Sequence, residues 1–262
     1  MSFPEKADRL REERLFHEAQ ARERSNRPSF LSDLVQKDQE YLDHASWIQP
    51  GIDSLGEIAG KLILDWGSGH GMASVCMARR GATVFSVDLS LGYCKESVSR
   101  ALTNQVGRLI CSIQSDACRL PFKDDLFDGI WGNAILHHVS PEGAAKELFR
   151  VLKPGGILVL CDPWQGSKLV RFIRDYIPYP GKSRTRDETP LDFGFLKIFT
   201  KHFQKIELSH WDFLGGLERL IPLGPFRKII RKTDRLLLDS IPWIANSSRY
   251  VMIKAIKEGP TS

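Results

Sequence analysis

Residues 62–71 read LILDWGSGHG: an apolar run ends at Asp65, and glycines follow at alternate positions, 67, 69 and 71. Glycine loses more conformational entropy on folding than any other residue, so three in one short loop indicate a backbone that turns sharply or approaches another group closely. In open α/β sheets, a glycine loop between a strand and a helix lets backbone N–H groups approach a ligand. The stretch therefore predicts a buried strand that ends at a ligand.

The same strand and helix alternation continues on the carboxyl side of this loop. Helical segments separate short apolar runs at residues 61–66, 82–88, 107–114, 127–133 and 155–162. Repeated β-α-β units imply a parallel sheet covered on both faces. Further runs at 203–213 and 248–257 complete a seven-stranded, mostly parallel α/β sheet. We expect the last strand to be antiparallel at one edge.

The flanking segments have a different character. Residues 5–25 are charge-rich and helical in pattern, and after Pro28 apolar residues recur at helical spacing as far as residue 48. Pro50 and Gly51 are expected to end this second helix. The organisation predicted is an N-terminal helical cap, residues 1–58, followed by one domain, residues 59–262. Two irregular basic segments, about 164–190 and 214–243, are predicted to be insertions in that domain.

Composition sets limits on the class of protein. The 262 residues carry a net charge of +5, which permits an anionic partner without requiring one. The five cysteines include no C-x-x-C pair, so neither a disulfide framework nor a zinc site is indicated, and we expect no metal. No apolar run approaches the roughly 20 residues that span a bilayer. The charged N-terminus differs from a signal peptide, so a cytoplasmic location is expected.

Several motifs together resemble one enzyme family. An NAD fingerprint, G-x-G-x-x-G, would need a third glycine where the chain has Met72. The form D-x-G-x-G-x-G instead resembles motif I of the class I S-adenosylmethionine (SAM) dependent methyltransferases, and in particular their type 11 domain. FDGIWGNAILHHV (127–139) is similar to the family's fourth-strand motif, and LFRVLKPGGILVL (148–160) to its helix, turn and fifth strand. The resemblance implies a Rossmann-like fold with SAM as cofactor and covers residues 61–162.

The resemblance also assigns roles to individual residues. Asp88 ends the second strand, where an acid binds both ribose hydroxyls in folds of this type. Asp116 resembles the family's acid that contacts the adenine amino group, with Ala117 beside it. The acid at Asp65 helps hold the cofactor's amino group in the family, and its alternative role is to cap the next helix. The implied cofactor-binding residues are Asp65, Gly67, Ser68, Gly69, Gly71, Asp88, Leu89, Asp116, Ala117 and Asn133.

Two histidines are candidates for acid–base chemistry. His137 and His138 follow the fourth strand directly, at the expected mouth of the site. Methyl transfer to a hydroxyl needs a base, and histidine is the residue that most often fills this role. Neighbouring residues on a short helix point in different directions, so at most one is expected to face the acceptor. The alternative is that the pair packs or caps the following loop.

The two insertions bear on the acceptor. The first contains aromatic and basic side chains that suit an anionic acceptor: Trp164, Arg171, Phe172, Arg174, Tyr176, Tyr179, Lys182, Arg184 and Arg186. In the second, an apolar helical face is predicted, made of Phe226, Ile229, Ile230, Thr233 and Leu237. Basic residues surround that face, so it either lies on an anionic membrane or packs on the core.

The prediction that follows is a SAM-dependent methyltransferase acting at oxygen or carbon of a small-molecule or lipid-linked metabolite. Peripheral membrane contact is compatible with it, and the oligomeric state stays open. An RNA methyltransferase is one alternative, although no separate RNA-binding module or charge block accompanies the domain. A non-catalytic SAM or nucleotide-binding protein is the other. Such a protein would keep the glycines and Asp88 but would not catalyse methyl transfer.

Overall fold

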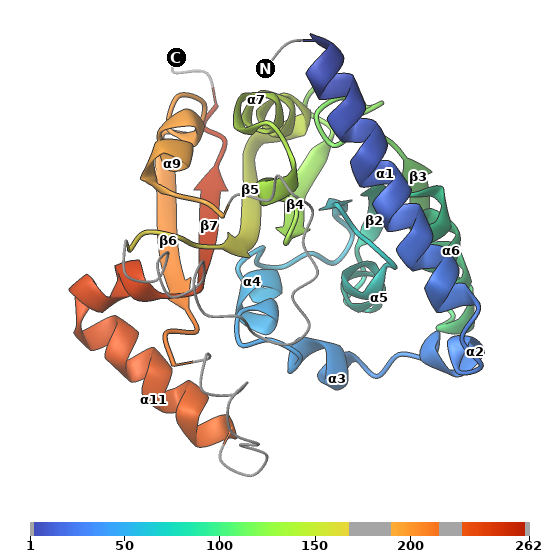
Figure 1. Cartoon of the computed structure of the whole chain (residues 1–262), viewed down its shortest axis with the longest axis horizontal. Coiled ribbons are helices and arrows are strands. Elements are labelled where there is room, and N and C mark those ends of the chain that lie inside the picture. Colours follow the sequence, from blue (N-terminus) through green and yellow to red (C-terminus); the bar gives the residue numbers. More distant parts are fainter. Residues whose placement is uncertain (1–2, 168–189, 215–226, 260–262) are drawn as a thin grey trace.

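A single seven-stranded sheet forms the centre of the computed structural model, which describes residues 3–167, 190–214 and 227–259 (Figure 1). The strands are β1 (Leu62–Trp66), β2 (Thr83–Asp88), β3 (Ile110–Gln114), β4 (Phe127–Asn133), β5 (Leu152–Pro163), β6 (Lys205–Trp211) and β7 (Tyr250–Ile256). Their spatial order is β3-β2-β1-β4-β5-β7-β6, with β1 to β5 parallel. Strand β7 lies between β5 and β6 and is antiparallel to both. The predicted fold class is confirmed.

Helices cover both faces of this sheet. Those between and after the strands are α5 (Met72–Arg79), α6 (Leu91–Thr103), η1 (Leu136–His138), α7 (Pro141–Val151), α9 (Phe193–Phe199), α11 (Arg227–Ser240) and η3 (Pro242–Ser247). Successive side chains of a strand point to opposite faces. On β1, Ile63 joins a core that includes α4 and α5, whereas Leu64 joins the core formed with α7 and α9. The β1 strand is therefore buried on both sides.

The N-terminal segment is helical, but not as predicted after Pro28. It forms α1 (Phe3–Ser25), α2 (Phe30–Asp33), α3 (Asp38–Leu42) and α4 (Ile48–Asp53) in place of two helices. Lys37 takes an extended conformation, with φ −100° and ψ 116°, and so separates α2 from α3. Pro50 and Gly51 do not end a helix and lie inside α4. Proline is tolerated there because the first turn of a helix does not use its N–H groups.

The division into short helices also changes which apolar residues are buried. Leu34, Leu42 and Ile48 are buried as expected, but Leu31 and Val35 are 76% and 63% exposed. The helical spacing of all these residues predicted a single buried face. That face does not persist because α2 already ends at Asp33 and the chain is extended at Lys37.

Helix α11 presents a different face to the body of the protein from the one predicted. Ile229 is 60% exposed and Thr233 is exposed, whereas Asp234 and Leu238 are buried. Polar contacts fix this rotation, because Asp234 accepts a hydrogen bond from the Leu214 N–H at 2.5 Å. Phe226 and the first-insertion residues 168–189 lie outside the described residues, as do the side chains of Arg227 and Lys228.

Candidate active site

The glycine loop connects β1 to α5 and has the backbone conformation that its sequence predicts. Gly67, Gly69 and Gly71 have φ of 69°, 51° and 83°, the left-handed region that favours glycine. A Cβ at Gly67 would overlap Ile135, and one at Gly71 would overlap Ser97. A Cβ at Gly69 would meet nothing within 4 Å. Two of the glycines are thus required for packing, and the middle one faces open space.

Asp88 holds this loop from the carboxyl end of β2. One carboxylate oxygen accepts a hydrogen bond from the Gly69 N–H at 2.8 Å, and the other accepts one from the Ser90 N–H at 2.9 Å. Burial raises the pKa of Asp88, and the two backbone hydrogen bonds oppose that shift. Each carboxylate oxygen has further acceptor capacity. The side chain can therefore accept from a pair of hydroxyls without releasing the loop.

Asp65 lies beneath the loop and not at its surface. Its side chain is buried, with the residue 2% exposed, and it accepts a hydrogen bond of 2.5 Å from the hydroxyl of Ser74 in the first turn of α5. Burial raises the pKa of Asp65 to about 7, although the hydroxyl and backbone hydrogen bonds from Ser74 lower it. This geometry matches the helix-capping alternative, and a role of Asp65 in cofactor binding stays a prediction.

The raised pKa of Asp65 predicts a specific pH dependence of stability. The folded protein binds a proton that the unfolded carboxyl releases above about pH 4, so the free energy of unfolding falls as the pH rises from 4 to 7. One such group lowers the free energy of unfolding by at most about 1.4 kcal/mol for each unit rise in pH.

The free energy of unfolding, measured with urea at pH 5 and at pH 7, is expected to fall less between these pH values for Asp65→Asn than for the wild type. The exposed control Asp8→Asn is expected to show the same fall as the wild type. An equal fall for Asp65→Asn and the wild type would contradict the assignment.

The loop after β3 brings Asp116 and Ala117 to the same edge of the sheet. Asp116 accepts a hydrogen bond from the Cys118 N–H at 2.8 Å, which fixes the turn. Trp66 is fully buried at the end of β1, and its indole N–H donates to the Ala117 carbonyl at 3.0 Å. The bulky side chain inside the glycine motif thus positions the Asp116 loop.

The remaining predicted cofactor residues are also held by hydrogen bonds. Asn133, at the end of β4, accepts from the indole N–H of Trp47 at 2.9 Å, and Trp47 stacks on Tyr250 with ring centroids 3.8 Å apart. The Ser68 hydroxyl accepts from Ser86 at 2.7 Å. Leu89 follows Asp88 directly, and its carbonyl accepts from the Gln114 side chain at 3.0 Å.

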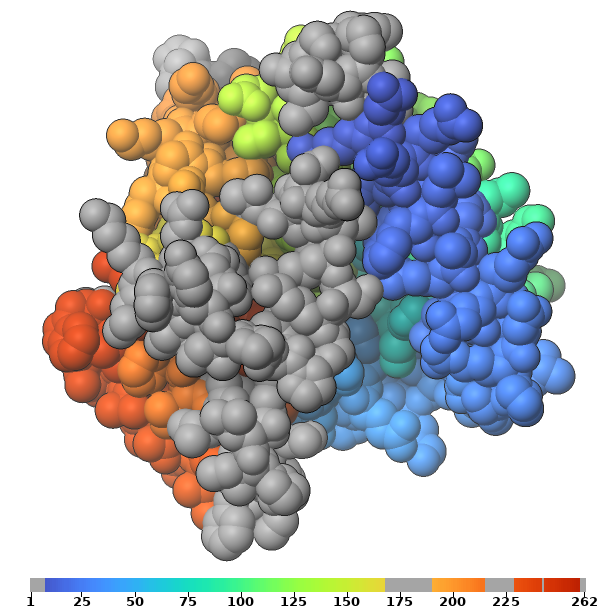
Figure 2. Space-filling view, in the orientation of Figure 1, coloured from blue at the N-terminus to red at the C-terminus, as the bar shows by residue number. Residues whose placement is uncertain are grey.

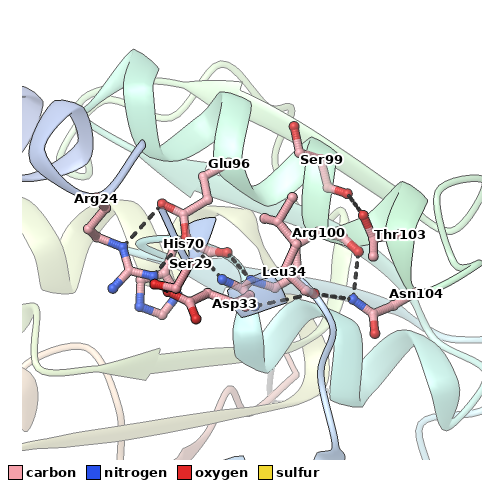
Figure 3. Close-up of polar contacts among 10 residues, drawn as sticks. All are labelled: Arg24, Ser29, Asp33, Leu34, His70, Glu96, Ser99, Arg100, Thr103 and Asn104. Atoms are coloured by element: carbon pink, nitrogen blue, oxygen red, sulfur yellow. Dashed lines mark hydrogen bonds and ion pairs between the residues drawn. The ribbon is translucent and has the colours of Figure 1, made fainter. Parts of the chain in front are cut away.

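A buried ion network ties the N-terminal cap to the glycine loop (Figure 3). Arg100 of α6 is 1% exposed and donates to the carbonyls of His70 at 2.9 Å and Asp33 at 2.6 Å. Glu96 pairs with both Arg100, at 2.9 Å, and Arg24 of α1, at 2.8 Å. Helix α1 therefore lies on α6 beside the loop, as Figure 1 shows. No periodic pattern or motif in the sequence predicts this network.

The two histidines after β4 have different partners. His137 Nδ1 lies 2.7 Å from Asp162 Oδ1, and the His137 backbone N–H reaches the same oxygen at 3.2 Å. His138 Nδ1 instead faces Glu13 of α1, 3.4 Å from its Oε1. The two ring centroids are 4.1 Å apart, and each ring turns toward a different carboxylate. That at most one of the two faces the acceptor stays a prediction.

Comparisons with known proteins agree with this geometry. Residues 64–160 match a family model described as a methyltransferase domain. A demethylmenaquinone methyltransferase from Tropheryma whipplei (strain Twist) is 34% identical over 190 residues, which are 69% of this chain and 75% of that relative. The chain belongs to the SAM-dependent methyltransferases. Relatives with the same description in Beutenbergia cavernae and Thermobifida fusca are 35% and 34% identical, and the matches cover 49% of each.

Solved structures share the fold of this methyltransferase. Geranyl diphosphate C-methyltransferase from Streptomyces coelicolor A3(2) has a TM-score of 0.58 at 19% identity, over 88% of this chain and 85% of that one. A putative sarcosine dimethylglycine methyltransferase from Galdieria sulphuraria has a TM-score of 0.60 at 15% identity, over 83% and 86%. A likeness at this identity establishes the class I fold and leaves the acceptor open.

The structure of the methyltransferase therefore gathers the predicted residues at one edge of its sheet. The glycine loop, Asp88, Asp116 and Asn133 follow β1, β2, β3 and β4 in turn, and parallel strands end at the same edge. Asp162, in β5, was not predicted, although an acid ending the apolar run GGILVLCD was its sequence signal. Glu13 of α1, which faces His138, was also missed, because nothing in a charge-rich helix distinguishes it.

Proposed function

We propose that this methyltransferase transfers the methyl group of SAM to an oxygen or carbon atom of a small-molecule or lipid-linked metabolite. The observation that carries the proposal is the paired carboxylate and imidazole, Asp162 and His137, beside the edge of the sheet that holds the glycine loop and Asp88. The relative named a demethylmenaquinone methyltransferase, which shares 34% identity, supports an acceptor of this class.

The chain's own side chains suit the cofactor. Asp88 would bind the ribose hydroxyls and Asp116 the adenine amino group, with Leu89 and Ala117 alongside. The open space at Gly69 would admit the methionine part of SAM, and Asn133 would lie near the reacting face. SAM supplies a methyl group on a sulfonium, so the protein need only hold the acceptor in line with it and exclude water.

Acceptor activation falls to His137 in this proposal. Its Nδ1–H donates to the fully buried Asp162, which leaves the Nε2 lone pair as the base. Asp162 Oδ2 has no hydrogen-bond partner among residues 3–167, 190–214 and 227–259. A buried carboxylate oxygen requires a partner, and an acceptor hydroxyl or a bound water can provide one. In this proposal, His137 Nε2 accepts the proton of an acceptor hydroxyl as the methyl group moves from the SAM sulfur to the acceptor oxygen.

A transfer assay tests the proposal. Radiolabelled SAM is incubated with the full chain and, in parallel, a short-chain demethylmenaquinone, geranyl diphosphate and total RNA. Label is expected in the quinone or in geranyl diphosphate, and not in RNA. Label in RNA alone would support the nucleic-acid alternative. SAM binding without transfer to any small molecule would support the non-catalytic alternative.

The outer face of α11 and η3 suits contact with a membrane that holds such an acceptor. On α11, Ile229 and Leu236 are 60% and 58% exposed at seven-residue spacing, with Lys232 exposed beside them, and Trp243 of η3 is 76% exposed. Arg231 and Arg235 make contacts within the protein, to the Asp43 carbonyl and to Asp239. In the described residues no helix has the length and apolar character needed to cross a bilayer. We propose a cytoplasmic enzyme that touches the membrane through this face.

Vesicle co-sedimentation tests the contact. The double variant Leu236→Ser with Trp243→Ser is expected to lose most binding to anionic vesicles, since burying a large apolar side chain contributes roughly 1.5 to 3 kcal/mol. Wild-type binding is expected to weaken at high salt. The control Leu31→Ser removes an apolar residue that is as exposed as Trp243, 76%, from α2, which lies on the opposite side of the protein from α11 in Figure 1. Failure of the wild type to sediment with anionic vesicles would contradict the proposed membrane contact.

A further inference from the structure

The side-chain amide of Asn133 is held in one orientation by the N-terminal cap. The indole N–H of Trp47 lies 2.9 Å from Asn133 Oδ1, and an indole N–H can only donate a hydrogen bond. The atom that faces Trp47 must therefore be the amide oxygen and not the nitrogen. Asn133 is partly exposed, and its Nδ2 has no hydrogen-bond partner among residues 3–167, 190–214 and 227–259. The side chain thus has its N–H donors available for a ligand.

Trp47 has little freedom to release this hydrogen bond. The residue is 8% exposed, and its ring stacks on Tyr250 of β7 with centroids 3.8 Å apart and planes 22° apart. Its carbonyl accepts from the Gly51 N–H at 2.9 Å, at the start of α4. Figure 2 shows the cap, in shades of blue, passing down one side of the molecule and along its lower edge. The later part of the cap therefore contacts the sheet edge through this ring.

The backbone beside Asn133 is held as well. Ala134 has φ of 56°, in the left-handed region that favours glycine, and its N–H donates to the Cys161 carbonyl at 2.8 Å. A residue with a side chain keeps this conformation only where its surroundings hold it, and such residues cluster at active and ligand-binding sites. Both the backbone turn and the side chain of Asn133 are thus fixed before a ligand arrives.

The position of Asn133 on the sheet indicates which part of SAM it faces. Strand β1 lies between β2, which ends at Asp88, and β4, which ends at Asn133. Trp66 pairs with Gly132 in the β1–β4 register, so the next residues, Gly67 and Asn133, meet where both strands end. In the proposed binding mode, the ribose lies on Asp88 and the methionine part at the glycine loop. The far end of the methionine part then reaches β4.

We propose that Asn133 donates to the α-carboxylate of SAM, and that Trp47 is a positioning residue whose indole N–H keeps the amide donors turned toward that carboxylate. This inference rests on the proposed function. The far end of the methionine part carries a carboxylate, which accepts hydrogen bonds, and an ammonium, which only donates them. Because Trp47 occupies the amide oxygen, the carboxylate is the better partner for Asn133. Hydrogen bonds to an ionised group are about twice as strong as neutral ones, so this orientation contributes to affinity.

Calorimetry on the full chain with SAM and with decarboxylated SAM tests this assignment. Decarboxylated SAM keeps the amine and the sulfonium and lacks only the carboxylate. Asn133→Asp keeps an oxygen for Trp47 but has no N–H donors. It is expected to bind SAM about tenfold more weakly or worse, which is the loss that charged hydrogen bonds predict. Its affinity for decarboxylated SAM is not expected to fall.

Trp47→Phe isolates the positioning role. Phenylalanine can still stack on Tyr250 but lacks the indole N–H, so SAM binding is expected to weaken about two- to tenfold. Binding of decarboxylated SAM is expected to stay at the wild-type level. Adding Trp47→Phe to Asn133→Asp is expected to weaken SAM binding no further, because no amide donors are left to orient. The control Ile58→Val alters the same core at the amino end of β1 and is expected to bind both ligands as the wild type does.

Thermal unfolding shows whether each variant is folded, and the pattern of binding decides the role of Trp47. Unchanged SAM affinity in folded Trp47→Phe would overturn the proposal, as would an equal loss for SAM and decarboxylated SAM. An additive loss in the double variant would contradict action through Asn133. SAM binding without methyl transfer would contradict the proposed function and leave this inference standing, because its test needs no acceptor. A wild type that binds neither ligand would contradict both.

Discussion

Replacing His137 by alanine is expected to lower kcat about 10²- to 10⁴-fold, the range that a positioned general base contributes. Asp162→Asn is expected to act through the same histidine, because an amide at this site no longer holds the Nδ1–H tautomer by a charged hydrogen bond of 2.7 Å. Both variants should bind SAM with wild-type affinity, since neither residue is assigned to the cofactor. Steady-state kinetics, with the acceptor that the transfer assay identifies, measure kcat of both variants. Calorimetry measures their affinity for SAM.

A matched control separates the loss of a base from a general effect of removing a histidine. His44→Ala, an exposed control, should keep the wild-type rate. A His137→Ala rate within threefold of the wild type would contradict the assignment of the base.

The second large effect concerns the glycine loop. Gly69→Val is expected to fold and to lose SAM binding, because a Cβ there meets no protein atom within 4 Å and would occupy the space assigned to the cofactor. The left-handed conformation, with φ 51°, costs a residue with a side chain about 1 to 2 kcal/mol. Gly67→Val should instead destabilise the fold itself, since its side chain would overlap Ile135.

Thermal unfolding and calorimetry distinguish the two variants. The expected result is a near-native melting curve without SAM binding for Gly69→Val, and a strongly lowered midpoint for Gly67→Val. Normal SAM affinity in folded Gly69→Val would move the cofactor away from this loop.

The parts of the fold that the sequence predicted are those with strong local signals. Strands β1, β4 and β5 are apolar runs that are mostly buried, and alternation with helices indicates the parallel direction of the first five strands. The three loop glycines have positive φ for the reason that their spacing indicated. Local preference and tertiary structure agree at these positions, so the pattern alone was sufficient.

The failures occur where tertiary contacts decide. The rotation of α11 follows from a buried Asp234 that accepts the Leu214 N–H, which an apolar periodicity cannot reveal. Pro50 read as a helix end but occupies a first turn that tolerates it. The pairing of His138 with Glu13 joins residues 125 positions apart, so no local pattern contains it.

Calorimetric titration of SAM into the wild type and Asp88→Ala tests the central claim most directly. One SAM per chain is expected to bind the wild type, and NAD and NADP are not. Loss of hydrogen bonds to a charged group costs about 1.5 to 3 kcal/mol, so Asp88→Ala should bind SAM about ten- to a hundredfold more weakly while remaining folded. Unchanged SAM affinity in folded Asp88→Ala, or binding of NAD in place of SAM, would contradict the account.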